Sequence, residues 1–455
     1  MALGRRLAKQ PPLVVAIADL PPAPGHPFYQ KLNHLLDEAG FDPFVQELCR
    51  PYYAAGLGRP SLPPGVYFRM LLIGYFEGID SQRGIAWRCA DSRSLATFLG
   101  FLLTEATPDH SSLTKIRQRL PREVHEQVFA FVLTLAHDQG LLAGRTVGVD
   151  ATYLEANASL KTIRRRDTGD DYKAYLRKLA QEAGLKEPTD PELRRFDRRR
   201  KGKKVSNTEW VSPSDPDSRI AKMKDGTTHL AYKAEHVVDL GSGLVLAAEV
   251  YPADRADSDT LRASVGSAQG HLDRAGTGAE VREAVADKGY HKAELLADCA
   301  AAGLRTYIPE AERSERRVWV DKPREWERAY RNNRRRVRGT RSKRLHRRRG
   351  EYVERTFAHV CDSGGARRSW LRGLVEVGKR YLVQVAGYNL GVLMRKVFGV
   401  GKPRVLQGAC AALGEGIRTG LASAAQLSGY GHAVVLPEGN SELTLAGGIA
   451  FMPAQ

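Results

Sequence analysis

The stretch RTVGVDATYLEANAS, residues 145–159, decides the fold. Apolar residues lead to a single carboxylate, Asp150, and a small, β-branched and aromatic segment follows it. This pattern predicts a buried strand whose acidic side chain lies where the strand emerges from a sheet. An isolated Asp in such a place is more often a turn or helix-capping residue, so the strand alone does not define a site.

A second stretch repeats the design and a third adds another acid. VREAVADKGYH, residues 281–291, places Asp287 at the end of a predicted strand, and a predicted helix over 351–358 carries Glu354. Three acids on separate elements of one α/β domain suit two Mg²⁺ ions, because Mg²⁺ prefers hard oxygen ligands. Two such ions, roughly 3.5–4 Å apart, cleave phosphodiesters by activating the attacking oxygen and stabilising the leaving one.

The composition favours a polyanionic partner. The chain has 455 residues with a formal net charge of +18, and residues 1–140 hold 14 Lys and Arg against 13 Asp and Glu. The positive surplus therefore lies almost entirely beyond residue 140, as expected for a surface that contacts phosphate. The five cysteines are scattered singly, which excludes a zinc knuckle or a disulfide framework and favours the cytoplasm. No apolar run is long enough to span a membrane.

The first third of the chain predicts a helical domain. A Pro-rich lead occupies residues 1–25, and helical apolar spacing punctuated by Pro and Gly follows over 26–140. The segment SSLTKIRQRL presents three cations, Lys115, Arg117 and Arg119, on a short helix. This helix is either the second helix of a helix-turn-helix or an amphipathic bundle helix with a solvated basic face.

Residues 141–400 predict a mixed sheet. After the Asp150 strand, a charged segment over 161–206 predicts a helical insertion, either a DNA-contacting surface or a solvated one. Two strands joined at Gly241-Ser242-Gly243 form a hairpin, and helices and strands then alternate. The resulting order β-β-β-α-β-α-β predicts a mixed sheet with helices on its faces.

A second charged segment covers residues 311–350, and its last part, RNNRRRVRGTRSKRLHRRRG, contains no acid. Like charges at this density repel one another, so we expect no packed core there and favour phosphate contact over a solvated arm. A long apolar-periodic helix, or a pair of helices, over 375–399 is expected to pack on the sheet. The tail, 401–455, is rich in Gly and Ala and carries no readable chemistry.

Two strands carry polar residues that need a separate interpretation. Alternation sends Glu235 and His236 to opposite faces of the hairpin strand, and His236 is expected to be a satisfied core histidine. Lys288 and Tyr290 follow Asp287 and either line the same cleft or serve the fold.

The ordered motifs also resemble those of a known family. PDHSSLTKIRQRLP, GLLAGRTVGVDATYLEANASLKT, VADKGYH and RRRGEYVERTFAH are similar to blocks of bacterial insertion-sequence transposases of the DDE, RNase H-like class, and the similarity extends from about residue 26 to about residue 406. The resemblance implies an RNase H-like catalytic domain and a helical N-terminal domain that serves end recognition or assembly. It also implies a metal-dependent endonuclease and strand transferase that acts on double-stranded DNA at the element's inverted ends. Two Mg²⁺ ions, with Mn²⁺ as a substitute, and a homo-oligomer on DNA at the nucleoid follow from the same resemblance.

The resemblance assigns the catalytic and metal-ligating roles to Asp150, Asp287 and Glu354. Related enzymes often place a Tyr and an Arg before the glutamate and a Lys after it at fixed spacing. Around Glu354, the position four residues before holds Gly350 and the position seven residues after holds Cys361. Glu351 would recover only Arg347, so Glu354 stays the first choice and Glu351 is the alternative third acid. The candidates for phosphate contact are Arg347, Arg348, Arg349, Arg355 and Lys288, together with Lys115, Arg117 and Arg119.

Three other functions remain open for such a sequence. A catalytically inactive DNA-binding relic would bind ends without cutting them. An RNase H-like nuclease would cut without strand transfer, and a basic RNA-associated structural protein would need no metal.

Overall fold

Helices occupy the beginning of the described chain. The computed structural model describes residues 25–54, 61–102, 104–201, 205–223, 225–312 and 318–404. Before the first long strand it contains α1 (Pro27–Glu38), α2 (Phe41–Cys49), α3 (Pro64–Glu77), α4 (Gln82–Asp91), α5 (Arg93–Phe98), α6 (His110–Arg119) and α7 (Arg122–Asp138). The predicted helical N-terminal region is thus confirmed. Residues 1–24 of the Pro-rich lead and 405–455 of the tail lie outside the described residues.

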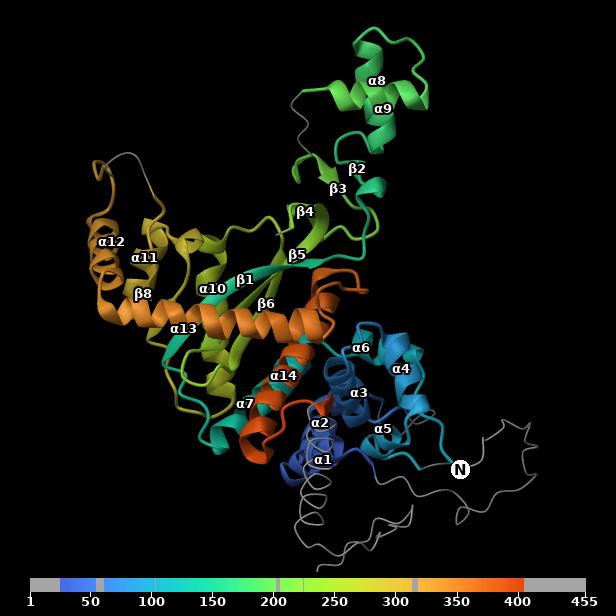
Figure 1. Cartoon of the computed structure of the whole chain (residues 1–455), viewed down its shortest axis with the longest axis vertical. Helices are drawn as coiled ribbons and strands as arrows, with labels where there is room; N and C mark the ends of the chain where they lie inside the picture. Colours follow the sequence, from blue (N-terminus) through green and yellow to red (C-terminus); the bar gives the residue numbers. More distant parts are fainter. Residues whose placement is uncertain are drawn as a thin grey trace, which may run out of the picture. The chain divides into compact units, whose positions relative to one another are not determined.

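A mixed sheet follows the helices (Figure 1). Its strands are β1 (Thr146–Glu155), β4 (Arg219–Lys222), β5 (Thr228–Asp239), β6 (Val245–Pro252), β7 (Glu283–Val285) and β8 (Arg305–Tyr307). β1 pairs antiparallel with β5 and parallel with β7, β7 pairs parallel with β8, and β4 and β6 both pair antiparallel with β5. The predicted mixed sheet is confirmed, and β4 is an additional short strand that the sequence pattern did not indicate.

Helices cover both faces of this sheet. His236 of β5 bonds to Thr356 of α13 (Thr340–Phe357) and to Tyr381 of α14 (Leu374–Phe398), so these helices lie on one face. Glu235, which points the opposite way, bonds to Ser264 of α10 (Asp257–Arg274) on the other face. His236 is fully buried with both ring nitrogens bonded, which confirms the prediction of a satisfied core histidine.

Helix α14 joins the helical region to the sheet. It contacts β6, α7 and α3, and most of its side chains are buried. The prediction that this apolar helix packs on the sheet is confirmed. Nearly all side chains of α3 are also buried, because α3 contacts four other helices, α2, α4, α6 and α14. No helix in the described part of the chain is long and apolar enough to cross a bilayer.

The first charged segment forms a small unit with its own core. It contains η3 (Leu160–Thr162), β2 (Arg164–Arg165), α8 (Tyr172–Glu182), α9 (Asp190–Arg199) and β3 (Trp210–Val211). Leu176 and Ala180 of α8 pack against Leu193 of α9, and β2 pairs with β3. The sequence predicted the helices of this unit. It did not predict the pairing of β2 with β3, because strands of two residues leave no periodic pattern.

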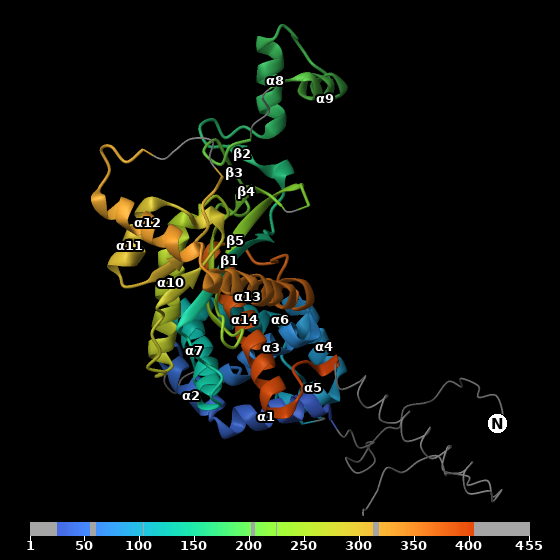
Figure 2. The ribbon, with the colours of Figure 1, turned by 60° about the vertical axis from the view of Figure 1, so that its left-hand side comes forward.

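The second charged segment is helical and takes part in the core. α12 (Arg324–Val337) contacts α11 (Ala293–Ala301) and β8, and α13 contacts β1, β5 and β7 (Figure 2). The expectation that this run avoids a packed core is wrong. Most of its arginines are exposed, whereas Arg336 and Arg349 are half-buried, and Asn333, Ser342 and Leu345 turn inward and are buried.

Candidate active site

Asp150 lies inside strand β1 and not at its end. β1 continues to Glu155 beside β5, whereas its pairing with β7 stops at Gly148 and Val285. The sequence therefore misplaced the strand end, and the edge at which Asp150 becomes accessible is the end of β7. The Asp150 side chain is 27% exposed, and one of its oxygens, Oδ1, accepts from its neighbour's backbone, Ala151 N, at 2.8 Å.

Asp287 lies two residues past the end of β7, the strand next to β1. Continuing the parallel register of Gly148 with Val285 by two residues brings Asp150 level with Asp287. Asp287 caps the short turn η4 (Lys288–Tyr290), since its Oδ1 accepts from Gly289 N at 2.8 Å. Each aspartate thus has one oxygen held by its own backbone, which fixes the direction of the carboxylate.

Arg349 of α13 covers Asp150. Its Nη1 donates to Asp150 Oδ2 at 2.8 Å, and its Nε is buried without a partner. The helix comes this close because residue 148 is glycine, where a Cβ would stand 2.8 Å from Leu240 Cδ2 and 3.1 Å from Arg349 Cγ. Burial raises the pKa of the Asp150 carboxyl and the charge of Asp287 raises it further, while Arg349 opposes both without reversing the direction.

The third acid is not in contact with the other two. Glu351 forms an i, i+4 ion pair with Arg355 at 2.6 Å, whereas Glu354 is exposed and forms no ion pair within the described residues. Arg349, which contacts Asp150, precedes Glu351 by two residues and Glu354 by five, so neither glutamate shares its side of α13. The choice between Glu354 and Glu351 stays a prediction.

The donor set suits a hard divalent cation only in part. Asp150 and Asp287 supply carboxylate oxygens at one level of the sheet, which is the chemistry that Mg²⁺ requires. However, nowhere in the described ranges do three or more His, Cys, Asp or Glu side chains come together in a group that could hold a metal ion. The two aspartates thus supply the right kind of donor atom, without a third protein ligand beside them in the described residues.

The candidate phosphate contacts differ in exposure and in whether they already contact another side chain of the protein. Arg347, Arg348, Lys288 and Lys115 are exposed. Three others are engaged within the protein: Arg349 with Asp150, Arg355 with Glu351, and Arg119 over the ring of Tyr53.

Arg117 does not fit the expected contact with DNA. It is buried and its Nε donates to Glu376 of α14 at 2.6 Å. α6 also buries Leu113 and Ile116, so it is a packed helix whose cation serves the junction with α14. The bundle-helix interpretation of this segment is the one that agrees with the structure.

A group of buried polar residues beneath Asp287 escaped the sequence interpretation. Lys233 and Glu235 of β5 point to the α10 face, and Tyr290 bonds to Glu235 from the η4 turn. The signal was present, because a Lys and a Glu two residues apart on a buried strand share one face and need partners.

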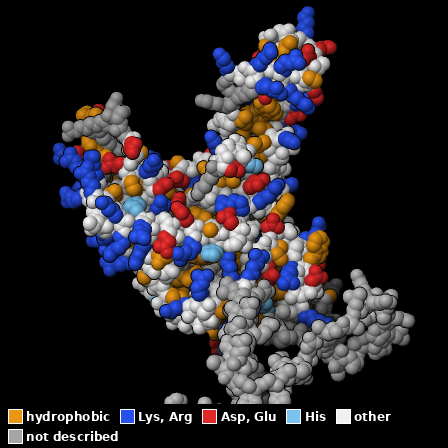
Figure 3. Space-filling view, viewed as in Figure 1, with side chains coloured by type: hydrophobic (Ala, Val, Ile, Leu, Met, Phe, Trp, Pro, Cys, Tyr) orange, Lys and Arg blue, Asp and Glu red, His pale blue; other side chains and the backbone are white. Residues whose placement is uncertain are grey.

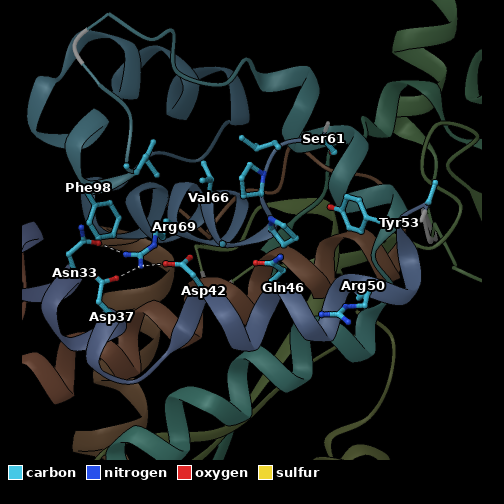
Figure 4. A pocket seen from close by; sticks show the side chains of 17 residues that line it. Asn33, Asp37, Asp42, Gln46, Arg50, Tyr53, Ser61, Val66, Arg69 and Phe98 are labelled. Atoms are coloured by element: carbon cyan, nitrogen blue, oxygen red, sulfur yellow. Dashed lines mark hydrogen bonds and ion pairs between the residues drawn. The ribbon is translucent and has the colours of Figure 1, made fainter. Parts of the chain in front are cut away.

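A large cavity lies away from these residues, among α1, α2 and α3 (Figure 4). Its volume is about 650 Å³, and the buried Arg69 beside it bonds to Asp37 at 2.8 Å, to Asp42 at 2.6 Å and to Asn33. Because Arg69 is already satisfied, its charge is not available to a ligand in this cavity.

Two family models match the chain. Residues 16–119 match the model described as a transposase domain (DUF772), and residues 198–390 match the model described as a transposase DDE domain. Together the matched ranges cover more than half of the chain. Asp287 and Glu354 lie within the second range, whereas β1 with Asp150 lies between the two. No curated protein matches the sequence.

Proposed function

This chain belongs to the DDE transposases of insertion sequences, and we propose that it cuts DNA at the inverted-repeat ends of such an element and joins the freed 3′-hydroxyl to a target. The observation that carries this proposal is the pair Asp150, on β1, and Asp287, just past the end of the adjacent parallel strand β7, with Arg349 of the arginine-rich helix bonded to Asp150. Acids at one edge of a sheet beside a basic helix suit the hydrolysis of a polyanion.

Asp150 and Asp287 would hold two Mg²⁺ or Mn²⁺ ions, with Glu354 as the third ligand and Glu351 as the alternative. Bound there, the ions supply Lewis-acid charge for the attacking and leaving oxygens. The protein's own contribution is position. Backbone N–H groups fix one oxygen of each aspartate, and Arg349 adds a positive charge above Asp150 where a phosphate oxygen can be neutralised.

The strand order supports an RNase H-like fold for the catalytic region. Along the path β6-β5-β1-β7-β8, the first three strands are antiparallel and the last two run parallel to β1. We assign end recognition or assembly to the helical region before residue 140, and we expect two or more copies on the DNA. Domain boundaries at about 140 and 400 belong to the same proposal.

Two basic surfaces support contact with the DNA backbone. Lys and Arg side chains gather over α12 and α13 and over the α8–α9 unit (Figure 3). Arg347 and Arg348 are exposed on α13 and directly precede Arg349, which contacts Asp150. On α9 the side opposite the buried Leu193 carries four exposed arginines at i, i+1, i+4 and i+5, namely Arg194, Arg195, Arg198 and Arg199.

The test is cleavage of labelled DNA that carries the repeats flanking the coding region. We expect nicking with Mg²⁺ or Mn²⁺, none in EDTA, and transfer of a pre-cleaved 3′-end to plasmid DNA. Cleavage without transfer would identify a plain nuclease. Specific binding of the ends without cleavage would identify an inactive relic, and preferential binding of RNA would exclude both enzymes.

A further inference from the structure

A buried polar network lies under the turn that carries Asp287. Lys233 and Glu235 are alternate residues of β5, so both point to the α10 side of the sheet, where they are 2% and 0% exposed. Charged groups are rarely buried so completely without a task, because apolar side chains of similar volume usually stabilise a core at least as well.

Lys233 connects this network to the start of α10. Its Nζ donates to Asp257 Oδ1 at 2.8 Å and to Thr260 Oγ1 at 2.9 Å, and it lies 3.6 Å from Glu235 Oε2. Asp257 is the first residue of α10, where the helix dipole favours a negative charge. The ammonium group thus fixes the position of the Asp257 carboxylate.

Glu235 gathers three hydroxyl groups. Thr260 and Tyr290 donate to Oε2 at 2.8 Å each, and Ser264 donates to Oε1. Burial raises the pKa of Tyr290, and the nearby carboxylates of Glu235, Asp257 and Asp150 raise it further, so the phenol keeps its proton and remains a donor. The bond from Tyr290 to Glu235 therefore ties the end of the η4 turn to the core.

Asp257 touches the same turn from the other side. A Cβ on Gly289 would stand 2.8 Å from Asp257 Oδ2 and 3.1 Å from Asp287 Oδ1, so the two carboxylates flank this glycine. Gly289 N is also the donor that holds Asp287 Oδ1. The Tyr290 bond thus ties down the short segment that sets the direction of the Asp287 carboxylate, and the Asp257 carboxylate lies close to Gly289 of that segment.

We propose that Tyr290, anchored on Glu235, and Asp257, anchored on Lys233, are positioning residues that aim Asp287 at the divalent cation. This inference rests on the proposed function, because it requires that Asp287 is a metal ligand. Substituting a residue that orients a metal ligand without binding the metal itself typically lowers metal affinity or activity roughly 10–100-fold. A network that served the fold alone would change stability and leave the metal affinity of the folded protein unaltered.

The experiment compares two hydroxyl deletions in one network. Tyr290→Phe removes the donor on the turn. Tyr251→Phe is the matched control, since Tyr251 bonds at 2.9 Å to Ser264, which bonds to the same Glu235, away from the turn. Mn²⁺ binding by the full chain is measured by calorimetry, and DNA cleavage is titrated with Mn²⁺. Circular dichroism checks that each variant is folded.

We expect Tyr290→Phe to weaken Mn²⁺ binding about ten-fold or more and to raise the half-saturating Mn²⁺ for cleavage equally, with the rate at saturating Mn²⁺ nearly restored. Tyr251→Phe should bind Mn²⁺ like the wild type. Equal effects of the two variants, or no effect of either, would overturn the inference. If Tyr290→Phe does not fold, Asp257→Asn at the partly exposed end of the network takes its place, and unchanged Mn²⁺ affinity there would overturn the inference.

Asp287→Asn separates this result from a failure of the proposed function. If wild type and Asp287→Asn bind Mn²⁺ alike, the metal site itself is wrong and the inference fails with it. If only Asp287→Asn loses binding while Tyr290→Phe retains it, the proposed function stands and the positioning role is refuted.

Discussion

Two buried cations of this chain, Arg69 and Lys233, each lie against a pair of carboxylates. The two pairs differ in how exposed the carboxylates are and in what else they lie against. Arg69 in the helical region is 5% exposed, and its partners Asp37 and Asp42 are 59% and 51% exposed. Lys233 in the sheet is equally buried, but its partner Glu235 is fully buried and its partner Asp257 reaches the Asp287 turn.

The comparison distinguishes Arg69, whose ion pairs stabilise the helical region, from Lys233, which we propose supports the metal site. The guanidinium of Arg69 donates to two half-exposed carboxylates, those of Asp37 and Asp42, beside the 650 Å³ cavity. Its positive charge is therefore balanced within the protein. The ammonium group of Lys233 bonds only Oδ1 of Asp257. The other oxygen, Oδ2, lies close to Gly289 in the η4 turn that follows Asp287, the proposed metal ligand. The 650 Å³ cavity therefore lies in the other region from the proposed site.

The largest expected effect comes from the aspartates themselves. Asp150→Asn and Asp287→Asn should each reduce metal-dependent cleavage on the order of a thousand-fold, because an amide cannot supply the charge that the metal ions need. DNA binding in a gel-shift assay without metal should remain close to wild type. A single-site variant that still nicks a cognate end at the wild-type rate would remove that residue from the site.

The next effect tests the comparison through stability. Lys233→Met leaves Glu235 buried without its counter-ion and should destabilise the fold by about 3–5 kcal/mol. Arg69→Met leaves only half-exposed carboxylates and should cost about 1.5–3 kcal/mol, the typical contribution of a hydrogen bond to a charged group. Urea unfolding at neutral pH measures both. Equal losses would mean that the two pairs play the same role.

A smaller effect is expected from the exposed face of α13. The double variant Arg347→Gln, Arg348→Gln should weaken DNA binding at low salt and reduce the slope of log affinity against log salt by about 0.9 for each phosphate that is no longer neutralised. The control is Arg262→Gln, Arg282→Gln, which removes two exposed arginines paired with Asp298 and Glu280. If both double variants change the slope equally, only the net charge matters and α13 makes no special contact.

The smallest effect concerns pH. Burial lowers the pKa of His236 in the sheet to about 3 and that of His125 in the helical region to about 4. Both stay neutral in the folded chain while the unfolded chain takes up protons below about pH 6.5, so stability falls as the pH decreases from there. His236→Gln or His125→Gln should reduce this slope by up to about 1.4 kcal/mol per pH unit, measured by urea unfolding at about pH 7, 6 and 5. An unchanged slope would mean that the histidine is already protonated in the folded state.

The sequence predicted those parts of the fold that leave a periodic pattern. The helices of the first region, the hairpin β5–β6 and the apolar α14 follow from apolar spacing, and the acids Asp150 and Asp287 stand out where apolar strands meet a charge. Strand lengths were less accessible. Asp150 lies in mid-strand because β5 supports β1 beyond the point where β7 stops, and the sequence of β1 does not contain that information.

The side chains of α13 show the other limit. Its arginines look alike in the sequence, yet Arg349 turns inward to Asp150 while Arg347 and Arg348 face solvent. Which face packs depends on a partner far along the chain, here Gly148 with no Cβ in the way. The network around Lys233 was missed for the same reason, since its partners lie on three separate elements.

The central claim is that Asp150 and Asp287 hold divalent metal together. Anomalous scattering from crystals of the chain soaked in Mn²⁺ tests it most directly. We predict a manganese peak within coordination distance of both carboxylates, lost in Asp287→Asn. Peaks found only elsewhere, or a peak at this position that persists in Asp287→Asn, would contradict it.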